Sequence, residues 1–429
     1  MKVVISAGGK GTRISSIKSD IPKPMIQIDG KPVLEHQINC LKEQGFLDII
    51  LVIGHLGSVI EDYFGDGTEW GVHISYYREV EPLGTAGALY YLKDVLTEDF
   101  LLINGDIIFS IDFNRFLQFH KEKKALASLF THPNSHPYDS SIICADEENC
   151  ITSWMNKEDA RTVYKNNVNA GVHILSTEIL DMLTNGGKVD LDREILKPLV
   201  ATKRLYSYRS PEYVKDMGTP ERYYLVCNDF VCGKVASKNL KNKQRAVFLD
   251  RDGTINVYKG FIRNQNDIEL IAGVANAIKT INESGYLAII VSNQPVIARG
   301  ECTLEQLQEI HNKLETELGK EGAYVDDIFF CPHHPDKGFE GERVEYKIEC
   351  ECRKPKPGLL LEAAKRYNID LEKSLMIGDD IRDYNAGINA GCRSFYVGGK
   401  PLEEVPSTNQ YSDLEECITN LVNKGELSW

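Results

Sequence analysis

Residues 246–249, Ala-Val-Phe-Leu, form an unbroken apolar run that stops at Asp250 and is followed by Asp252 and Gly253. Such a run predicts a buried strand that ends at a carboxylate. If strand geometry persists, Asp250 and Asp252 point to one side and Arg251 to the other. Neighbouring carboxylates repel unless a cation lies between them, and Gly253 allows a tight turn. The pattern predicts a site for Mg²⁺ and a phosphate ester with one nucleophilic aspartate; a solvated acidic turn is the plainer alternative.

Composition narrows the classes of protein that this chain can represent. Its 429 residues suit two or three domains, and its formal charge of −14 argues against a general nucleic-acid binder, although small anions need only local positive charge. No apolar run has the length of a membrane-spanning helix, and the first residues enter a strand rather than a signal peptide. The eleven cysteines are mostly scattered. We therefore expect a reduced, cytoplasmic protein with one metal cluster and no membrane partner.

The N-terminal half begins with a predicted strand, residues 3–7, that runs into a glycine-rich segment. Its candidate phosphate-binding residues are Gly8, Gly9, Gly11, Thr12 and Arg13. Glycines let backbone N–H groups approach phosphate oxygens, and arginine adds a bidentate donor. The spacing is that of neither a P-loop nor the dinucleotide fingerprint. Shortly afterwards, Pro22 and Pro24 hold Lys23 in a semi-rigid turn.

Together, the glycine-rich segment and the Pro-Lys-Pro-Met turn resemble the sugar-1-phosphate nucleotidyltransferases. Further segments that match this family follow in order along the first 232 residues. The resemblance implies roles for Gly84 and Thr85 at the base and sugar, for Asn169 and Gly171 in the sugar pocket, and for Asp106 and Asp216 as Mg²⁺ ligands.

The chemistry of nucleotidyl transfer accounts for these residue types. A sugar phosphate oxygen must attack the α-phosphorus of a nucleoside triphosphate, and both reactants are anions. Mg²⁺ between Asp106 and Asp216 would reduce their repulsion, while Arg13 and Lys23 would stabilise charge on the transferring phosphate and on pyrophosphate. Positioning and electrostatics would carry the rate without a covalent intermediate.

One segment departs from the family pattern. Lys157 falls where the family usually has Glu-Glu-Lys-Pro, but Asn156 replaces a glutamate that normally holds sugar hydroxyls. The resemblance predicts Lys157 as a ligand of the sugar phosphate; a surface lysine is the alternative. Residues 132–140 resemble a loop of the heptose- and mannose-type guanylyltransferases of this family, and we interpret them as loop structure rather than as a metal site.

Residues 233–244 are polar and basic and are expected to form a linker between domains 1–232 and 245–429. In the second domain, the strand at 286–291 ends at Ser292 and Asn293, and the strand at 375–378 ends at Asp379. Alternating strands and helices predict a parallel sheet, whose active site lies at the carboxyl ends of its strands.

The order of these segments resembles the haloacid-dehalogenase-like phosphatases. More narrowly, it resembles the D-glycero-D-manno-heptose 1,7-bisphosphate 7-phosphatases and the histidinol phosphatases. The resemblance makes Asp250 the nucleophile and Asp252 the general acid/base. It further implies Ser292 and Lys354 as phosphoryl ligands, Asp250, the backbone carbonyl of Asp252 and Asp379 as Mg²⁺ ligands, and Asn293, Arg299 and Arg353 as substrate contacts. Pro295, where the family usually has serine, removes one possible backbone donor.

Cysteine and histidine residues gather between residues 331 and 352. Three thiolates and one imidazole make the closed tetrahedral set of a structural zinc site. The resemblance assigns Cys331, His333, Cys350 and Cys352 and leaves His334 outside. Because Arg353 and Lys354 follow at once, we expect zinc to order the loop that positions them.

The sequence therefore predicts an α/β protein of two domains. The first is a Rossmann-like nucleotidyltransferase with a mixed sheet, and the second is a haloacid-dehalogenase-like Rossmannoid domain with a zinc loop. The predicted enzyme removes the 7-phosphate of heptose 1,7-bisphosphate and activates heptose 1-phosphate, with GTP favoured, for surface polysaccharide. Alternatives are the same chemistries on mannose 1-phosphate, another hexose 1-phosphate or histidinol phosphate, or one half acting as a degenerate scaffold. A homo-oligomer is possible.

Overall fold

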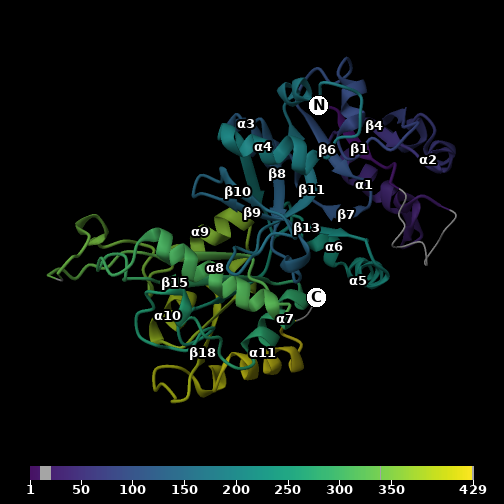
Figure 1. Ribbon diagram of the computed structural model, residues 1–429. Coiled ribbons are helices and arrows are strands. Elements are labelled where there is room, and N and C mark those ends of the chain that lie inside the picture. The colour runs from purple at the N-terminus through teal and green to yellow at the C-terminus, as the bar shows by residue number, and fades with distance from the viewer. Residues whose placement is uncertain (10–20, 339, 428–429) are drawn as a thin grey trace. The chain divides into compact units, whose positions relative to one another are not determined.

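The computed structural model describes residues 1–9, 21–338 and 340–427 (Figure 1). The chain forms two compact units, each assembled from three segments. The first contains Met1–His132, Ile143–Met155 and Asn169–Asn239, and the second contains Pro133–Ile142, Asn156–Val168 and Leu240–Trp429.

The first unit is built on a mixed sheet of nine strands. Its parallel part consists of β6 (Phe100–Asn104), β1 (Val3–Ser6), β4 (Asp48–Ile53) and β5 (His73–Arg78). Antiparallel β11 (Val168–Leu175) joins β6 to the remaining strands, which are β8 (Ala127–His132), β9 (Ile142–Ala145), β10 (Ile151–Met155) and β12 (Leu205–Arg209). This confirms the predicted mixed sheet.

Both faces of this sheet are buried. In β1, Val3 and Ile5 belong to one apolar cluster and Val4 to another, as the alternation of strand side chains requires. The helices of the unit are α1 (Val33–Lys42), α2 (Gly57–Phe64), α3 (Phe113–Lys123), α4 (Lys197–Leu199), α5 (Pro220–Val231) and α6 (Lys234–Ser237). A small sheet of β7 (Ile107–Ser110) and β13 (Tyr213–Asp216), together with the short pair β2 (Gln27–Ile28) and β3 (Lys31–Pro32), completes it.

The second unit contains the predicted parallel sheet, which has six strands. Its order is β16 (Asp327–Cys331), β15 (Leu287–Asn293), β14 (Ala246–Leu249), β17 (Leu375–Gly378), β18 (Arg393–Val397) and β19 (Gln410–Tyr411). Val247 and Leu249 of β14 face one apolar core, and Ala246 and Phe248 face the other. Because β14 is paired in parallel with both β15 and β17, the carboxyl ends of these three strands lie side by side at one edge of the sheet.

Helices cover both faces of the parallel sheet. The core on one face receives side chains from α7 (Val274–Ser284), α8 (Leu304–Lys320) and α11 (Leu414–Asn423). The core on the other face receives them from α9 (Gly358–Tyr367) and α10 (Ile381–Ala390). The unit is a three-layer α/β structure.

Two segments that are distant in sequence complete the second unit beside α8. The Tyr164 N–H donates to Thr316 Oγ1 over 3.0 Å, and that hydroxyl lies 3.0 Å from the Tyr164 carbonyl oxygen. The Asn166 N–H donates to Glu315 Oε2 over 2.7 Å. Because Glu315 and Thr316 are almost fully buried, segments 133–142 and 156–168 are integral parts of this unit. The predicted domains, 1–232 and 245–429, instead place both of these segments in the first domain.

The predicted linker, residues 233–244, is folded over part of its length. It includes α6, and Val235 is buried in a core of the first unit while Leu240 is buried in a core of the second. The apolar contacts of the segment are therefore divided between the units at residues 239 and 240.

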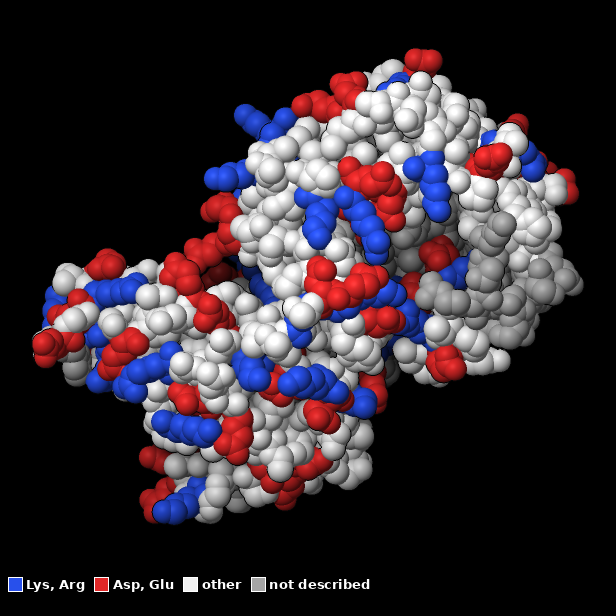
Figure 2. Space-filling view, in the orientation of Figure 1, with Lys and Arg blue, Asp and Glu red and all other residues white. Residues whose placement is uncertain are grey.

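No helix in the described part of the chain combines the length and apolar character needed to cross a membrane. Acidic and basic side chains are interspersed on the face that Figure 2 shows. Local clusters, rather than the net charge, therefore decide where an anionic substrate could bind.

Candidate active sites

The first candidate site lies at the carboxyl edge of the parallel sheet. Asp250 directly follows β14, and its Oδ1 lies 2.6 Å from Nζ of Lys354. The same ammonium group also contacts Asp383 Oδ1 at 2.6 Å and the Val291 carbonyl oxygen at 2.7 Å. Although burial alone would lower the pKa of Lys354, the two carboxylates outweigh burial and raise it. Lys354 is therefore a fixed cation beside the predicted nucleophile.

Three carboxylates converge at this point. Asp250, Asp379 and Asp383 each offer an oxygen, and these oxygens lie within 4.8 Å of one another. Burial, followed by the charges of the other two carboxylates, raises the pKa of Asp379 to about 7. Burial likewise raises the pKa of Asp383, to about 6. Such a set of hard oxygen donors, with more negative charge than Lys354 balances, fits Mg²⁺.

A glycine makes this convergence possible. Gly253 has a φ of +92°, and a Cβ placed on it would lie 2.1 Å from Asp379 Oδ2. A larger side chain would therefore displace the Asp379 carboxylate as well as strain the backbone. The predicted turn at Gly253 thus also leaves room for Asp379, which follows β17, to reach the site.

The side chain of Asp252 does not join the three carboxylates. It is held by Arg251, whose Nη2 lies 2.7 Å from Asp252 Oδ2, and by Nε2 of Gln294 at 2.9 Å. Burial would raise the pKa of Asp252, but the neighbouring Arg251 guanidinium and these hydrogen bonds lower it. The predicted alternation of faces does not hold, because β14 ends at Leu249 and the chain turns before Asp252. Arg251 and Asp252 consequently meet.

Hydrogen bonds or ion pairs hold three other predicted phosphatase residues, Ser292, Asn293 and Arg299. Ser292 is buried at the end of β15 and accepts a hydrogen bond from Gln294 over 2.9 Å. The side-chain amide of Asn293 and the backbone of Lys354 exchange two hydrogen bonds, of 3.1 and 3.0 Å. Arg299 pairs with Glu301 over 2.7 Å. The structure therefore brings Ser292, Asn293 and Lys354 together, and their roles toward substrate stay predictions.

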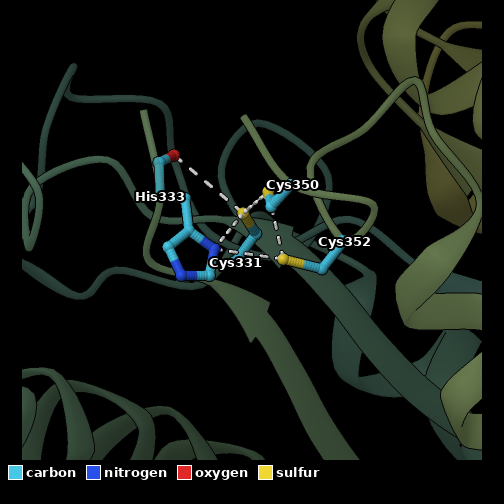
Figure 3. Close-up of side chains that lie close together, drawn as sticks. All are labelled: Cys331, His333, Cys350 and Cys352. Atoms are coloured by element: carbon cyan, nitrogen blue, oxygen red, sulfur yellow. Dashed lines mark hydrogen bonds between the residues drawn. The ribbon is translucent and has the colours of Figure 1, made fainter. Parts of the chain in front are cut away.

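The predicted zinc ligands also converge (Figure 3). Cys350 Sγ lies 3.5 Å from Cys331 Sγ and 3.3 Å from Cys352 Sγ, and His333 Nδ1 lies 3.3 Å from Cys352 Sγ. All four donor atoms lie within 4.8 Å of one another. Three sulfurs and one imidazole nitrogen at these separations fit a tetrahedral zinc ion. Nη1 of Arg353 donates to the His333 carbonyl oxygen over 3.2 Å, so the cluster is joined to the loop of Lys354.

A second candidate site lies in the first unit, where Asp106 and Asp216 are neighbours through the pairing of β7 with β13. Lys23 Nζ lies 2.5 Å from Asp106 Oδ2, and Arg222 Nη1 lies 2.9 Å from Asp216 Oδ2. Burial would raise the pKa of Asp216, but Arg222, the Gly218 N–H and Lys23 together lower it. Two carboxylates with two flanking cations form a site that fits both a divalent metal and phosphate oxygens.

The glycine-rich segment begins beside this site. Gly8 follows β1 closely, and a Cβ placed on it would lie 2.8 Å from Glu79 Oε2 and 3.3 Å from the Gly54 nitrogen. A side chain would not fit there without displacing Glu79. Gly9 has open space on that side. The predicted residues Gly11, Thr12 and Arg13 lie outside the described residues.

Backbone pairing and hydrogen bonds hold each of the segments predicted at the base and sugar. Gly84, with a φ of +78°, pairs with Val189, and Thr85 Oγ1 accepts from the Leu191 N–H over 2.7 Å. Asn169 Oδ1 accepts from the Gly171 N–H over 3.2 Å. Lys157 is exposed within segment 156–168, which belongs to the second unit, and its role stays a prediction.

Three residues that sequence reasoning did not select take part in these arrangements. Asp383 lies four residues after Asp379, on the first turn of α10, and this spacing was a signal that could have identified it. Arg251 was expected to point away from its neighbours. Asp192 lies beside Asn169 of β11, and no sequence motif indicated this contact.

Comparison with known proteins assigns a family to each chemistry. The nucleotidyl transferase family model matches residues 2–231, and the HAD-hydrolase-like model matches residues 351–408. A D-glycero-beta-D-manno-heptose-1,7-bisphosphate 7-phosphatase from Photorhabdus laumondii is 41% identical over 184 residues, which are 41% of this chain and 96% of that protein.

Two solved structures are also similar. HddC from Yersinia pseudotuberculosis is 28% identical, with a TM-score of 0.46, over 53% of this chain and 99% of that one. A D,D-heptose 1.7-bisphosphate phosphatase from B. bronchiseptica, complexed with magnesium and phosphate, is 30% identical, with a TM-score of 0.36, over 42% of this chain and 99% of that one.

The folds and their carboxylate sites define an enzyme with two phosphate-handling units. The chain belongs to the nucleotidyl transferase family and also to the family of the heptose-bisphosphate 7-phosphatases. The families predicted from the motifs are thereby confirmed, as is the assignment of both units to sugar-phosphate metabolism.

Proposed function

We propose that this enzyme catalyses two consecutive steps in the synthesis of GDP-heptose. The second unit removes the 7-phosphate of D-glycero-D-manno-heptose 1,7-bisphosphate, and the first unit transfers GMP from GTP to the resulting heptose 1-phosphate, with release of pyrophosphate. The observation that carries the proposal is the presence, in one chain, of a carboxylate–lysine site of the 7-phosphatase family and a two-carboxylate site of the nucleotidyl transferase family.

In the phosphatase step, an oxygen of Asp250 attacks the phosphorus of the 7-phosphate. The bond from phosphorus to the sugar oxygen breaks, and Asp252, which must be protonated for this step, gives that oxygen its proton. Water then attacks the aspartyl phosphate while Asp252 takes up the proton, and phosphate leaves. Lys354 and Ser292 hold the phosphoryl oxygens during both displacements. When bound by Asp250, Asp379 and Asp383, Mg²⁺ would supply the positive charge that lets an anionic nucleophile approach a phosphate.

In the transferase step, an oxygen of heptose 1-phosphate attacks the α-phosphorus of the nucleotide, and the bond to pyrophosphate breaks. Lys23 and Arg13 would stabilise the charge on the transferring and leaving groups. Asp106 and Asp216 would hold Mg²⁺ between the reactants. No residue of this unit needs to form a covalent bond.

The sugar and the base are the finer parts of the proposal. Heptose 1-phosphate is supported because a 7-phosphatase produces the substrate that a sugar-1-phosphate nucleotidyltransferase consumes. GTP is supported by the likeness of residues 132–140 to the heptose- and mannose-type guanylyltransferases. A zinc ion on Cys331, His333, Cys350 and Cys352 would be structural, because its four positions are filled by protein.

The test is incubation of the full chain with heptose 1,7-bisphosphate, Mg²⁺ and each of the four nucleoside triphosphates in turn. We expect phosphate release in every case and GDP-heptose with GTP. Asp250→Asn should abolish phosphate release while transfer to supplied heptose 1-phosphate continues, and Asp106→Ala should have the reverse effect. Formation of no GDP-heptose by the wild-type enzyme would refute the proposal.

A further inference from the structure

Asp192 is a half-buried carboxylate beside the predicted sugar segment of the first unit. Its two oxygens lie 3.3 and 3.5 Å from the side-chain nitrogen of Asn169, and the described residues include no lysine or arginine that forms an ion pair with it. Burial, followed by the charge of Asp190, raises the pKa of Asp192 to about 6, and Arg193 lowers it only partly. A carboxylate in such surroundings has unused acceptor capacity.

The orientation of Asn169 is set by the other side of its amide. Its Oδ1 accepts from the Gly171 N–H over 3.2 Å and lies 3.1 Å from Nε2 of His173. His173 is buried, and burial lowers its pKa to about 3, so the imidazole is neutral and can donate through Nε2. With the oxygen occupied in this way, the Asn169 nitrogen must face Asp192. The two side chains form one polar surface with a donor and an acceptor.

This polar surface is connected to the segment predicted at the base and sugar. Asp192 lies one residue after Leu191, whose N–H donates to Thr85 Oγ1 over 2.7 Å, and the Thr85 N–H donates to the Val189 carbonyl oxygen over 3.0 Å. A Cβ on Gly84 would lie 2.4 Å from that same carbonyl oxygen. The glycine therefore allows segments 84–86 and 189–192 to pack closely, which places Asp192 between the two predicted substrate segments.

We propose that Asp192 binds ring hydroxyl groups of the sugar 1-phosphate, as a specificity-determining residue of the transferase. The assignment rests on the proposed function of the first unit. A carboxylate attracts hydroxyl donors and repels phosphate, so the sugar ring rather than the phosphate is its partner.

The decisive variant is Asp192→Asn, which keeps the size of the side chain and removes its charge. We expect KM for the sugar 1-phosphate to rise about 10- to 100-fold, because charge-assisted hydrogen bonds are lost, while KM for the nucleotide and kcat change less than about twofold. Asp190→Asn is the matched control: Asp190 is exposed and caps the short helical segment Leu191–Leu196, which contains Asp192, and its loss of charge should leave KM for the sugar nearly unchanged.

Deoxy analogues of the sugar 1-phosphate identify the hydroxyl concerned. Removal of the hydroxyl that Asp192 binds should raise KM in the wild type and have little further effect in Asp192→Asn. In the wild type alone, the ratio of KM values for the deoxy and parent sugars should fall as the pH is lowered through about 6, since Asp192 becomes protonated; ionisation of the phosphate cancels from this ratio. This measurement does not depend on the folding of a variant.

The outcomes are distinct. Equal losses for each deoxy sugar in wild type and variant, or equal increases in KM for sugar and nucleotide, would overturn the role of Asp192 while leaving the proposed function intact. Failure of the wild type to transfer a nucleotidyl group to any sugar 1-phosphate would overturn the proposed function and this assignment with it.

Discussion

Arg251 and Asp252 form a buried ion pair at the proposed phosphatase site. Arg251 is completely buried, and its guanidinium holds the Asp252 carboxylate at 2.7 Å. Placing a cation in the core is costly unless it is paired. The pair therefore fixes the conformation of Asp252, the proposed general acid/base, and the buried Arg251 in turn depends on the Asp252 carboxylate.

Replacement of this arginine tests the pair at the level of stability. Arg251→Met should lower the free energy of unfolding of the second unit by about 3 kcal/mol at neutral pH, because Asp252 is left buried without its cation. Chemical denaturation followed by far-UV circular dichroism, which does not require an active enzyme, measures this loss. In the double variant Arg251→Met/Asp252→Asn, part of the stability should return. Equal stability of the wild type and Arg251→Met would contradict the interpretation.

The pH dependence of the same variant has a defined sign. Since the folded-state pKa of Asp252 is lowered, its contribution to stability is present above the unfolded value of about 4 and is lost as the pH falls through the folded value. The difference in stability between wild type and Arg251→Met should therefore shrink on acidification below about pH 4. Denaturation curves at pH 3 and pH 7 measure this change.

At the scale of elements, the cysteine cluster connects β16 to the loop before α9. Cys331 ends β16, and Cys350 and Cys352 directly precede Arg353 and Lys354. A metal ion that joins these segments would fix the loop, and structural zinc contributes on the order of 10 kcal/mol to folding in small domains. The lysine that contacts Asp250 would then depend on an ion that takes no part in the reaction.

Loss of one ligand tests this dependence. Cys350→Ser should release zinc and abolish phosphatase activity, while nucleotidyl transfer to supplied sugar 1-phosphate continues, because the first unit contains no residue of the cluster. Elemental analysis and the two activity assays provide the measurements. Cys232→Ser, at an exposed cysteine outside the cluster, is the control. Full phosphatase activity in zinc-free protein would show that the cluster has another role.

The strands that carry the candidate site residues, and their order along the chain, could be predicted from the sequence. Apolar runs that end in carboxylates, such as residues 246–250, are a strong local signal of buried strands. The partners of those carboxylates could not be predicted so well. The alternation rule assumed that the strand continued to Asp252, but β14 ends at Leu249 and Arg251 turns back. Asp192 could not be placed beside Asn169, because their contact depends on packing between segments 23 residues apart and not on a motif.

For the whole molecule, the main departure from the sequence-based view is the interleaving of the two units. Segments 133–142 and 156–168 belong to the unit that contains α8, although they lie within the predicted first domain. A fragment cut at the predicted boundary, 245–429, would lack the segments that cover Glu315 and Thr316. We therefore expect this fragment to be less stable than the second unit of the full chain.

A single substitution tests the same contact in the full chain. Thr316→Val leaves the buried Tyr164 N–H without its acceptor and should lower the stability of the second unit by about 1–3 kcal/mol. Denaturation followed by phosphatase activity measures the effect. The control is Thr280→Val on α7, where the hydroxyl donates to the Asn276 carbonyl oxygen of its own helix. If the two valine variants were equally stable, the contact between segment 156–168 and α8 would not stabilise the second unit.

The interleaving also affects how the chain folds as it is made. Tyr164 and Thr316 are 152 residues apart. At about 5–20 residues per second, roughly 8–30 s pass between the emergence of the two partners from the ribosome. During that interval, residues 156–168 have no α8 on which to pack. The nascent polypeptide must therefore keep these residues available until most of the protein has been translated.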